Sequence, residues 1–83
     1  MYELLAPVAK DMDQLEATLA APDSAERVRK IGAALEATAG RVSDATQLVG
    51  TDEERLALQK IYRGVVAARS IVLNLHELRQ ERH

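Results

Sequence analysis

The side chains that could support catalysis or bind a metal ion are few in this sequence. Asp11, Asp13 and Glu16 are the densest carboxylate group, the kind used in acid–base chemistry or for holding a cation. At this spacing on a helix such residues usually form a solvated face, so we expect no carboxylate site. The two histidines, His76 and His83, offer too few nitrogen ligands for an ordinary zinc site, and the chain has no cysteine.

Arginines and loops give no stronger indication of an enzyme. Small all-helical mutases bind dianionic substrates with several arginines that face the bundle interior, but Arg41, Arg55 and Arg63 fall off the apolar stripes here. There is no glycine-rich phosphate loop, nucleophile elbow or metal-binding motif. We therefore predict a protein that is not an enzyme and has no catalytic residues, no cofactor and no metal ion.

The composition indicates one small domain with no evident affinity for nucleic acid or for a bilayer. The 83 residues, 47% of them apolar, predict a single helical domain over 1–83 with a modest core. A net charge of −2, with an acidic segment 1–26 before a mildly basic remainder, gives no electrostatic reason to bind nucleic acid. The apolar run around Arg69 is too short to span a membrane and no signal peptide is visible, so we expect a soluble cytoplasmic protein.

Three stretches with the helical spacing of apolar residues predict an all-α fold. The first covers about 3–20, and its apolar face is formed by Leu5, Val8, Met12, Leu15 and Leu19. The second covers about 24–49 and the third about 52–79. Each is long enough to form a helix of several turns.

Capping residues mark the ends of the second and third predicted helices. Asp23 is the expected N-cap of the second, and Gly50 in a left-handed conformation is its expected C-cap. Thr51 followed by Glu54 forms a capping box at the start of the third. So short a connection predicts an antiparallel hairpin, although Gly40 could interrupt its first arm. The N-terminal helix either packs on the hairpin as the third member of a bundle or packs on a partner protein.

The third predicted helix carries more apolar surface than one neighbouring helix can cover. Its expected seam with the second helix consists of Ile61, Val65, Ala68, Val72 and Leu75. Further apolar residues widen the arc to roughly 240°, where a two-stranded seam needs nearer 100°. The predicted partner-binding residues are those of the two flanks: Tyr62, Val66, Arg69 and Leu73 on one, and Ile71 and Leu78 on the other. The N-terminal helix or another chain must cover them.

Parts of the chain resemble a known family of small helical proteins. The similar pieces are Leu15-Glu16 with Leu19, Leu35, the acidic turn 50–54 and the run VVAARSIVLNL at 65–75. They resemble co-chaperones of type III secretion needle subunits. The resemblance implies a cytoplasmic helical hairpin that docks a helical-repeat chaperone and helps keep the needle subunit soluble before export. It also implies that Tyr62, Val66 and Leu73 lie on the docking face.

Two other interpretations are consistent with the same residues. In one, two copies bury the same flank of the third helix against each other, which makes a structural homo-oligomer. In the other, the chain is a small regulatory adaptor whose partner the sequence does not name.

Overall fold

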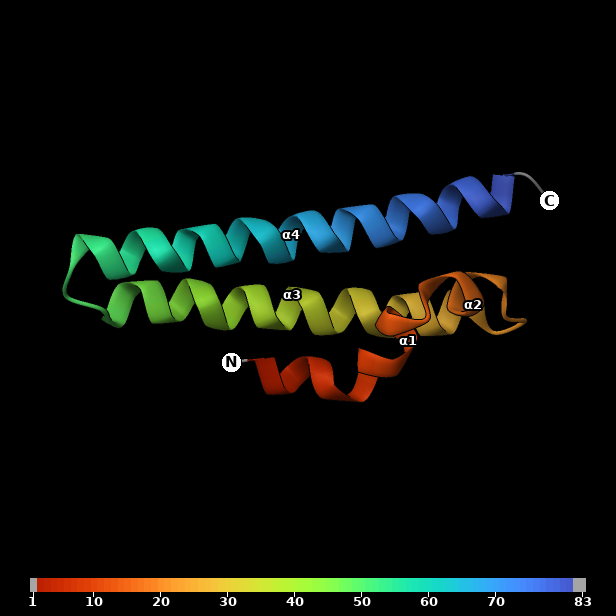
Figure 1. Cartoon of the computed structure of the whole chain (residues 1–83), viewed down its shortest axis with the longest axis horizontal. Coiled ribbons are helices and arrows are strands. Elements are labelled where there is room, and N and C mark those ends of the chain that lie inside the picture. Colours follow the sequence, from red (N-terminus) through yellow and green to blue (C-terminus); the bar gives the residue numbers. More distant parts are fainter. Residues whose placement is uncertain (1, 82–83) are drawn as a thin grey trace.

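The structure, a computed structural model, describes residues 2–81 and is all-α. A 3₁₀ helix, η1 (Tyr2–Val8), and two short helices, α1 (Ala9–Asp13) and α2 (Leu15–Ala20), precede a long hairpin. The hairpin consists of α3 (Ser24–Leu48) and α4 (Asp52–Glu81), which lie antiparallel along a molecule that measures 49 × 22 × 16 Å (Figure 1). The predicted all-α fold and antiparallel hairpin are confirmed, with both arms close to their predicted ranges.

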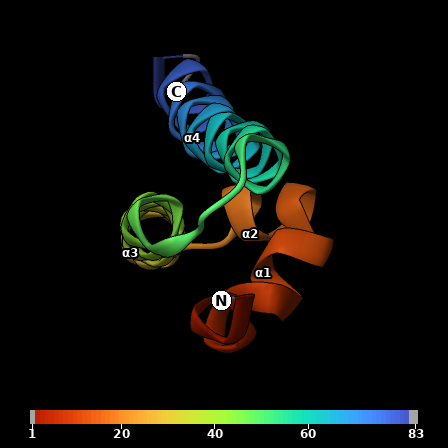
Figure 2. The ribbon, with the colours of Figure 1, turned by 90° about the vertical axis from the view of Figure 1, so that its left-hand side faces the viewer.

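α3 is the most buried helix because it is covered on two sides. α4 packs along one side of it, and the N-terminal segment formed by η1, α1 and α2 packs along another (Figure 2). Its buried residues are Ser24, Val28, Ile31, Gly32, Leu35, Thr38, Ala39 and Val42. α4 buries only Val65 and Val72. Gly40 does not interrupt α3, which is continuous to Leu48.

The caps of the hairpin agree in position with the sequence at two of three places. The backbone N–H of Glu54 donates to the Thr51 hydroxyl at 3.2 Å, as predicted for the start of α4. Asp23 is the N-cap residue of α3, but its side chain makes no cap hydrogen bond, and its carboxylate pairs with Arg27 one turn later at 3.0 Å. Gly50 is not left-handed, since no described glycine has a positive φ, and the chain leaves α3 through an extended Val49. The predicted position of Asp23 at the N-cap is therefore confirmed without its side-chain hydrogen bond, and the left-handed C-cap predicted for Gly50 was wrong.

The N-terminal segment is not the single helix predicted over about 3–20. Pro7 lies inside η1, and a proline ring collides with the preceding turn of an α-helix. The chain then bends at Gln14, where φ is −116° and ψ is 49°. The bend lets the segment wrap around α3, so that Val8 is buried and its other apolar residues pack on the core: Leu5, Met12, Leu15 and Leu19.

A side-chain hydrogen bond stabilises the bend at Gln14. In a straight helix the Asp11 carbonyl oxygen would accept the N–H of Leu15, four residues later. Here the hydroxyl of Thr18 donates to that oxygen at 2.9 Å, and Thr18 is only 1% exposed. Around the bend, Arg27 lies 3.6 Å from the carboxylate of Asp11 and so links α1 to α3. This ion pair is partly exposed and contributes about 0–1 kcal/mol.

We expect Thr18→Val to lower the free energy of unfolding by about 1–3 kcal/mol, because the substitution leaves the Asp11 carbonyl without its buried donor. Thr38→Val is the matched control, since Thr38 is 0% exposed and its hydroxyl donates only to the carbonyl of Ala34, four residues earlier in the same helix. That carbonyl keeps its backbone donor, so the loss should be well below about 1 kcal/mol. Urea unfolding followed by circular dichroism measures both, and equal losses would contradict the role of Thr18.

Candidate protein-binding surface

α4 carries most of the large apolar side chains that are exposed in the described part of the chain. Their exposed fractions lie between 40 and 59%, and they are Leu56, Tyr62, Val66, Ile71, Leu75 and Leu78. The cause is the arrangement of the fold. The N-terminal segment covers mainly α3 and touches α4 only through α2, so that over most of its length α4 packs against α3 alone (Figures 1 and 2).

The seam between the two long helices differs from the predicted one toward the end of α4. Leu75, predicted to face α3, is 40% exposed, whereas Leu73, predicted for the partner-binding flank, packs against the core. Its Cδ2 lies 3.6 Å from where a Cβ on Gly32 would stand. In a straight α-helix, residues seven apart differ in direction by about 20°. Over two heptads this difference turns Leu75 away from α3 and brings Leu73 toward it.

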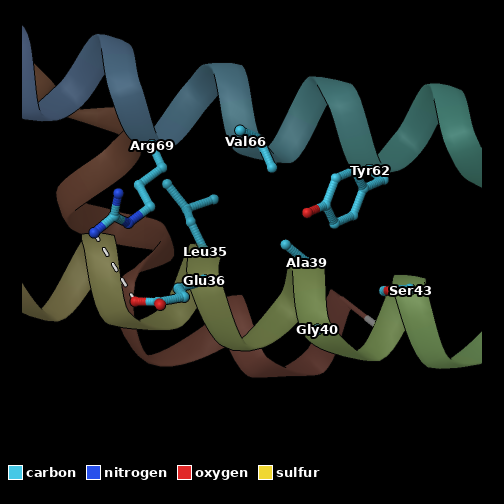
Figure 3. Close-up of a pocket in the computed structure, with 8 residues that line it drawn as sticks. All are labelled: Leu35, Glu36, Ala39, Gly40, Ser43, Tyr62, Val66 and Arg69. Atoms are coloured by element: carbon cyan, nitrogen blue, oxygen red, sulfur yellow. Dashed lines mark ion pairs between the residues drawn. The ribbon is translucent and has the colours of Figure 1, made fainter.

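Three of the predicted partner-binding residues line one groove between the long helices. Tyr62, Val66 and Arg69 contribute its α4 side (Figure 3). Its α3 side is formed by Leu35, Glu36, Ala39, Gly40 and Ser43. The groove has a volume of about 370 Å³ and opens on the face of the hairpin opposite the N-terminal segment (Figure 3). We call it the hairpin groove.

The floor of the hairpin groove is made of small residues and its rim is polar. A Cβ atom added to Gly40 would meet no atom within 4 Å, so the floor of the groove is open at this residue. At one end Arg69 lies 3.9 Å from Glu36, a loose and partly exposed ion pair. The Nε atom of Arg69 is buried and has no hydrogen-bond partner in residues 2–81. One polar atom at this end of the groove is therefore left without a hydrogen bond.

The other predicted partner-binding residues lie elsewhere on α4. Ile71 and Leu78 are exposed on its outer face, and Leu73 is held in the contact with α3. The structure thus divides the six residues among a groove, the outer face and the core. The α3 half of the groove was missed in the sequence, where its one signal is a glycine, Gly40, inside a long helical pattern.

The residues considered for chemistry are not brought together. Asp11 pairs with Arg27, Arg41 pairs with Glu3 at 3.3 Å, and the guanidinium of Arg55 donates to a backbone carbonyl at 3.5 Å. The described residues contain no group of three or more His, Cys, Asp or Glu that could hold a metal ion.

His76 belongs to the packing between the ends of the two long helices. Its Nε2 lies 3.4 Å from the hydroxyl of Ser24 and 3.4 Å from the side-chain amide of Gln80. His83 lies outside the described residues. Within residues 2–81, no helix has both the length and the apolar character needed to cross a bilayer.

The fold and the groove define a small all-α hairpin protein, and comparison with known proteins places it in a family. The chain belongs to the type III secretion system regulatory protein HrpD6 family, whose model matches residues 2–78. Regulatory protein HrpD6 of Xanthomonas oryzae pv. oryzicola is 33% identical over 72 residues, which cover 87% of this chain and 90% of that protein. No solved structure matches.

The family assignment confirms one part of what the sequence resemblance implied. The chain is a protein of type III secretion. The narrower role of needle-subunit co-chaperone stays a prediction.

We expect Gly40→Ala to raise the free energy of unfolding by about 1 kcal/mol, because alanine is the better helix former and the new Cβ meets no atom. Gly32→Ala is the matched comparison, since its Cβ would make ordinary contact with Leu73 away from the groove. Thermal and urea unfolding measure both changes. A loss of stability in Gly40→Ala would show that the groove floor is not open.

Proposed function

We propose that this chain is a non-enzymatic, cytoplasmic protein-binding module of type III secretion that docks a partner protein through the hairpin groove. The partner is a helical-repeat chaperone, and the pair keeps the needle subunit soluble before export. The hairpin groove carries this proposal, since it is an open, apolar-lined recess on the longest and least covered helix.

The groove suits one turn of a partner helix. An aliphatic or aromatic side chain from the partner would fill the space above Gly40 and pack between Val66 and Leu35. Tyr62 stands at the rim with 42% of its surface exposed, which suits an anchor that has an apolar ring and a polar hydroxyl. These contacts favour a partner side chain that is apolar and fits the shape of the groove.

Arg69 adds a polar requirement to this site. Its ion pair with Glu36 is long enough that the guanidinium can turn toward a bound partner. Once the guanidinium has turned, a carboxylate or a carbonyl oxygen on the partner, placed beside the apolar side chain, would satisfy the buried N–H that has no acceptor within residues 2–81. The expected partner helix therefore presents an apolar residue next to an acidic or exposed carbonyl group.

A regulatory adaptor is the second candidate function. The name of the family and of its relative in Xanthomonas describes a regulatory protein, and a regulator could use the same groove to hold a different partner. The two candidates differ in the partner captured: a chaperone with its needle subunit, or a component that controls the system.

Co-purification of the full chain with the helical-repeat chaperone and the needle subunit of the same secretion system tests the proposal. We expect a ternary complex with the native chain, and at least a roughly tenfold loss of chaperone affinity with Val66→Asp, because a carboxylate would stand in the apolar groove. Ser70→Asp adds the same charge at an exposed position of α4 outside the groove and should bind as the native chain does.

The results distinguish a failure of the proposed co-chaperone role from a failure of the proposed docking site. If neither the chaperone nor the needle subunit binds the native chain, the co-chaperone role is wrong. If Val66→Asp binds with native affinity while its circular dichroism is unchanged, the hairpin groove is not the docking site.

A further inference from the structure

α4 carries a second line of apolar and small residues on its outer face. Ala57, Ile61, Gly64, Ala68, Ile71, Leu75 and Leu78 follow one another at alternating spacings of four and three, the pattern of a coiled-coil seam. We call this line the outer seam. Ile61 and Ala68 at its inner edge touch the core, while Ile71, Leu75 and Leu78 are exposed. No helix of residues 2–81 lies along the outer side of α4 (Figure 1).

We propose that the outer seam joins two copies of this chain through antiparallel α4 helices. At every second position the seam changes from small residues in its first half, Ala57 and Gly64, to large residues in its second half, Ile71 and Leu78. An antiparallel pair centred near Ala68 places Leu78 opposite Ala57 and Ile71 opposite Gly64. Each of these two large side chains then meets a small one, while Ile61 and Leu75 face Asn74 and Lys60, whose aliphatic portions can pack beside them.

A parallel pair would lack this complementarity. It would put Leu78 against Leu78 and Ile71 against Ile71 at one end, and Ala57 against Ala57 at the other, so the helices would splay. The antiparallel pair is also isologous, with the same surface on both copies, which is the commonest symmetry of protein dimers.

The charges on α4 favour the same orientation. Its first turn is acidic, with Asp52, Glu53 and Glu54, and its last turn is basic at Arg79. In an antiparallel pair the same flanks of the two helices face each other, so Glu54 of one copy lies near Arg79 of the other. The helix dipoles also oppose each other favourably. A parallel pair would bring the acidic turns together and repel.

The antiparallel pair explains why a glycine stands at position 64. A glycine in the middle of a helix weakens it relative to alanine, and a Cβ on Gly64 would meet no atom within 4 Å in the single chain. In the antiparallel pair the missing side chain makes room for Ile71 of the partner copy. The hairpin groove lies on the other flank of α4, so the pair leaves the groove open for a different protein.

Sedimentation equilibrium of the full chain at high micromolar concentration tests the pairing. We expect twice the mass of one chain, and the mass of one chain for Ile71→Asp, while Val66→Asp in the groove stays dimeric. Gly64→Leu should also be monomeric although it adds an apolar side chain, because the room for Ile71 is lost. A native chain that sediments as a monomer, or a Gly64→Leu chain that stays dimeric, overturns the proposal.

Single cysteines test the orientation, since the native chain has none. A short bis-maleimide should cross-link Ala67→Cys to itself near the two-fold axis. It should not cross-link Ala57→Cys to itself, because those positions lie about 30 Å apart in the antiparallel pair. A mixture of Ala57→Cys and Leu78→Cys should cross-link. Cross-linking of Ala57→Cys alone would establish the parallel pair and overturn the proposal.

Discussion

The burial of α3 between α4 and the N-terminal segment is the contact on which this fold depends. Ile31, Leu35 and Val42 on α3 are almost completely buried, and burying each such side chain contributes about 1.5–3 kcal/mol. The chain has no Phe or Trp, so the core consists of aliphatic residues of moderate size. α3 is covered by α4 on one side and by the N-terminal segment on another, whereas α4 is covered mainly by α3.

That imbalance links the stability of the protein to its function. Small domains bury a modest fraction of their surface and are marginally stable, so apolar surface left outside favours association. On α4 this surface takes two forms: the hairpin groove beside Arg69, and the outer seam around Ile71. They lie on different flanks, so a partner protein in one and a second copy on the other are sterically compatible.

Membership of the HrpD6 family makes this chain a protein of type III secretion. The exposed apolar residues of α4 are the reason why we propose a protein-binding role. Small residues occur at both surfaces, with Gly40 in the groove and Gly64 on the seam, and a Cβ on either would meet no atom. Both glycines weaken their helices relative to alanine, and both would give room to the proposed partner helices.

The hairpin, its turn and the Thr51 cap could be predicted from the sequence, because apolar spacing and capping are local properties of consecutive residues. Only Tyr62, Val66 and Arg69 of the groove could be predicted, since its α3 half is set by how two helices pair. The bend at Gln14 needs the Thr18 hydroxyl to reach the Asp11 carbonyl, a contact that no periodicity indicates. The exchange of Leu73 for Leu75 came from helical drift, which accumulates along α4 and becomes decisive only against a packed neighbour.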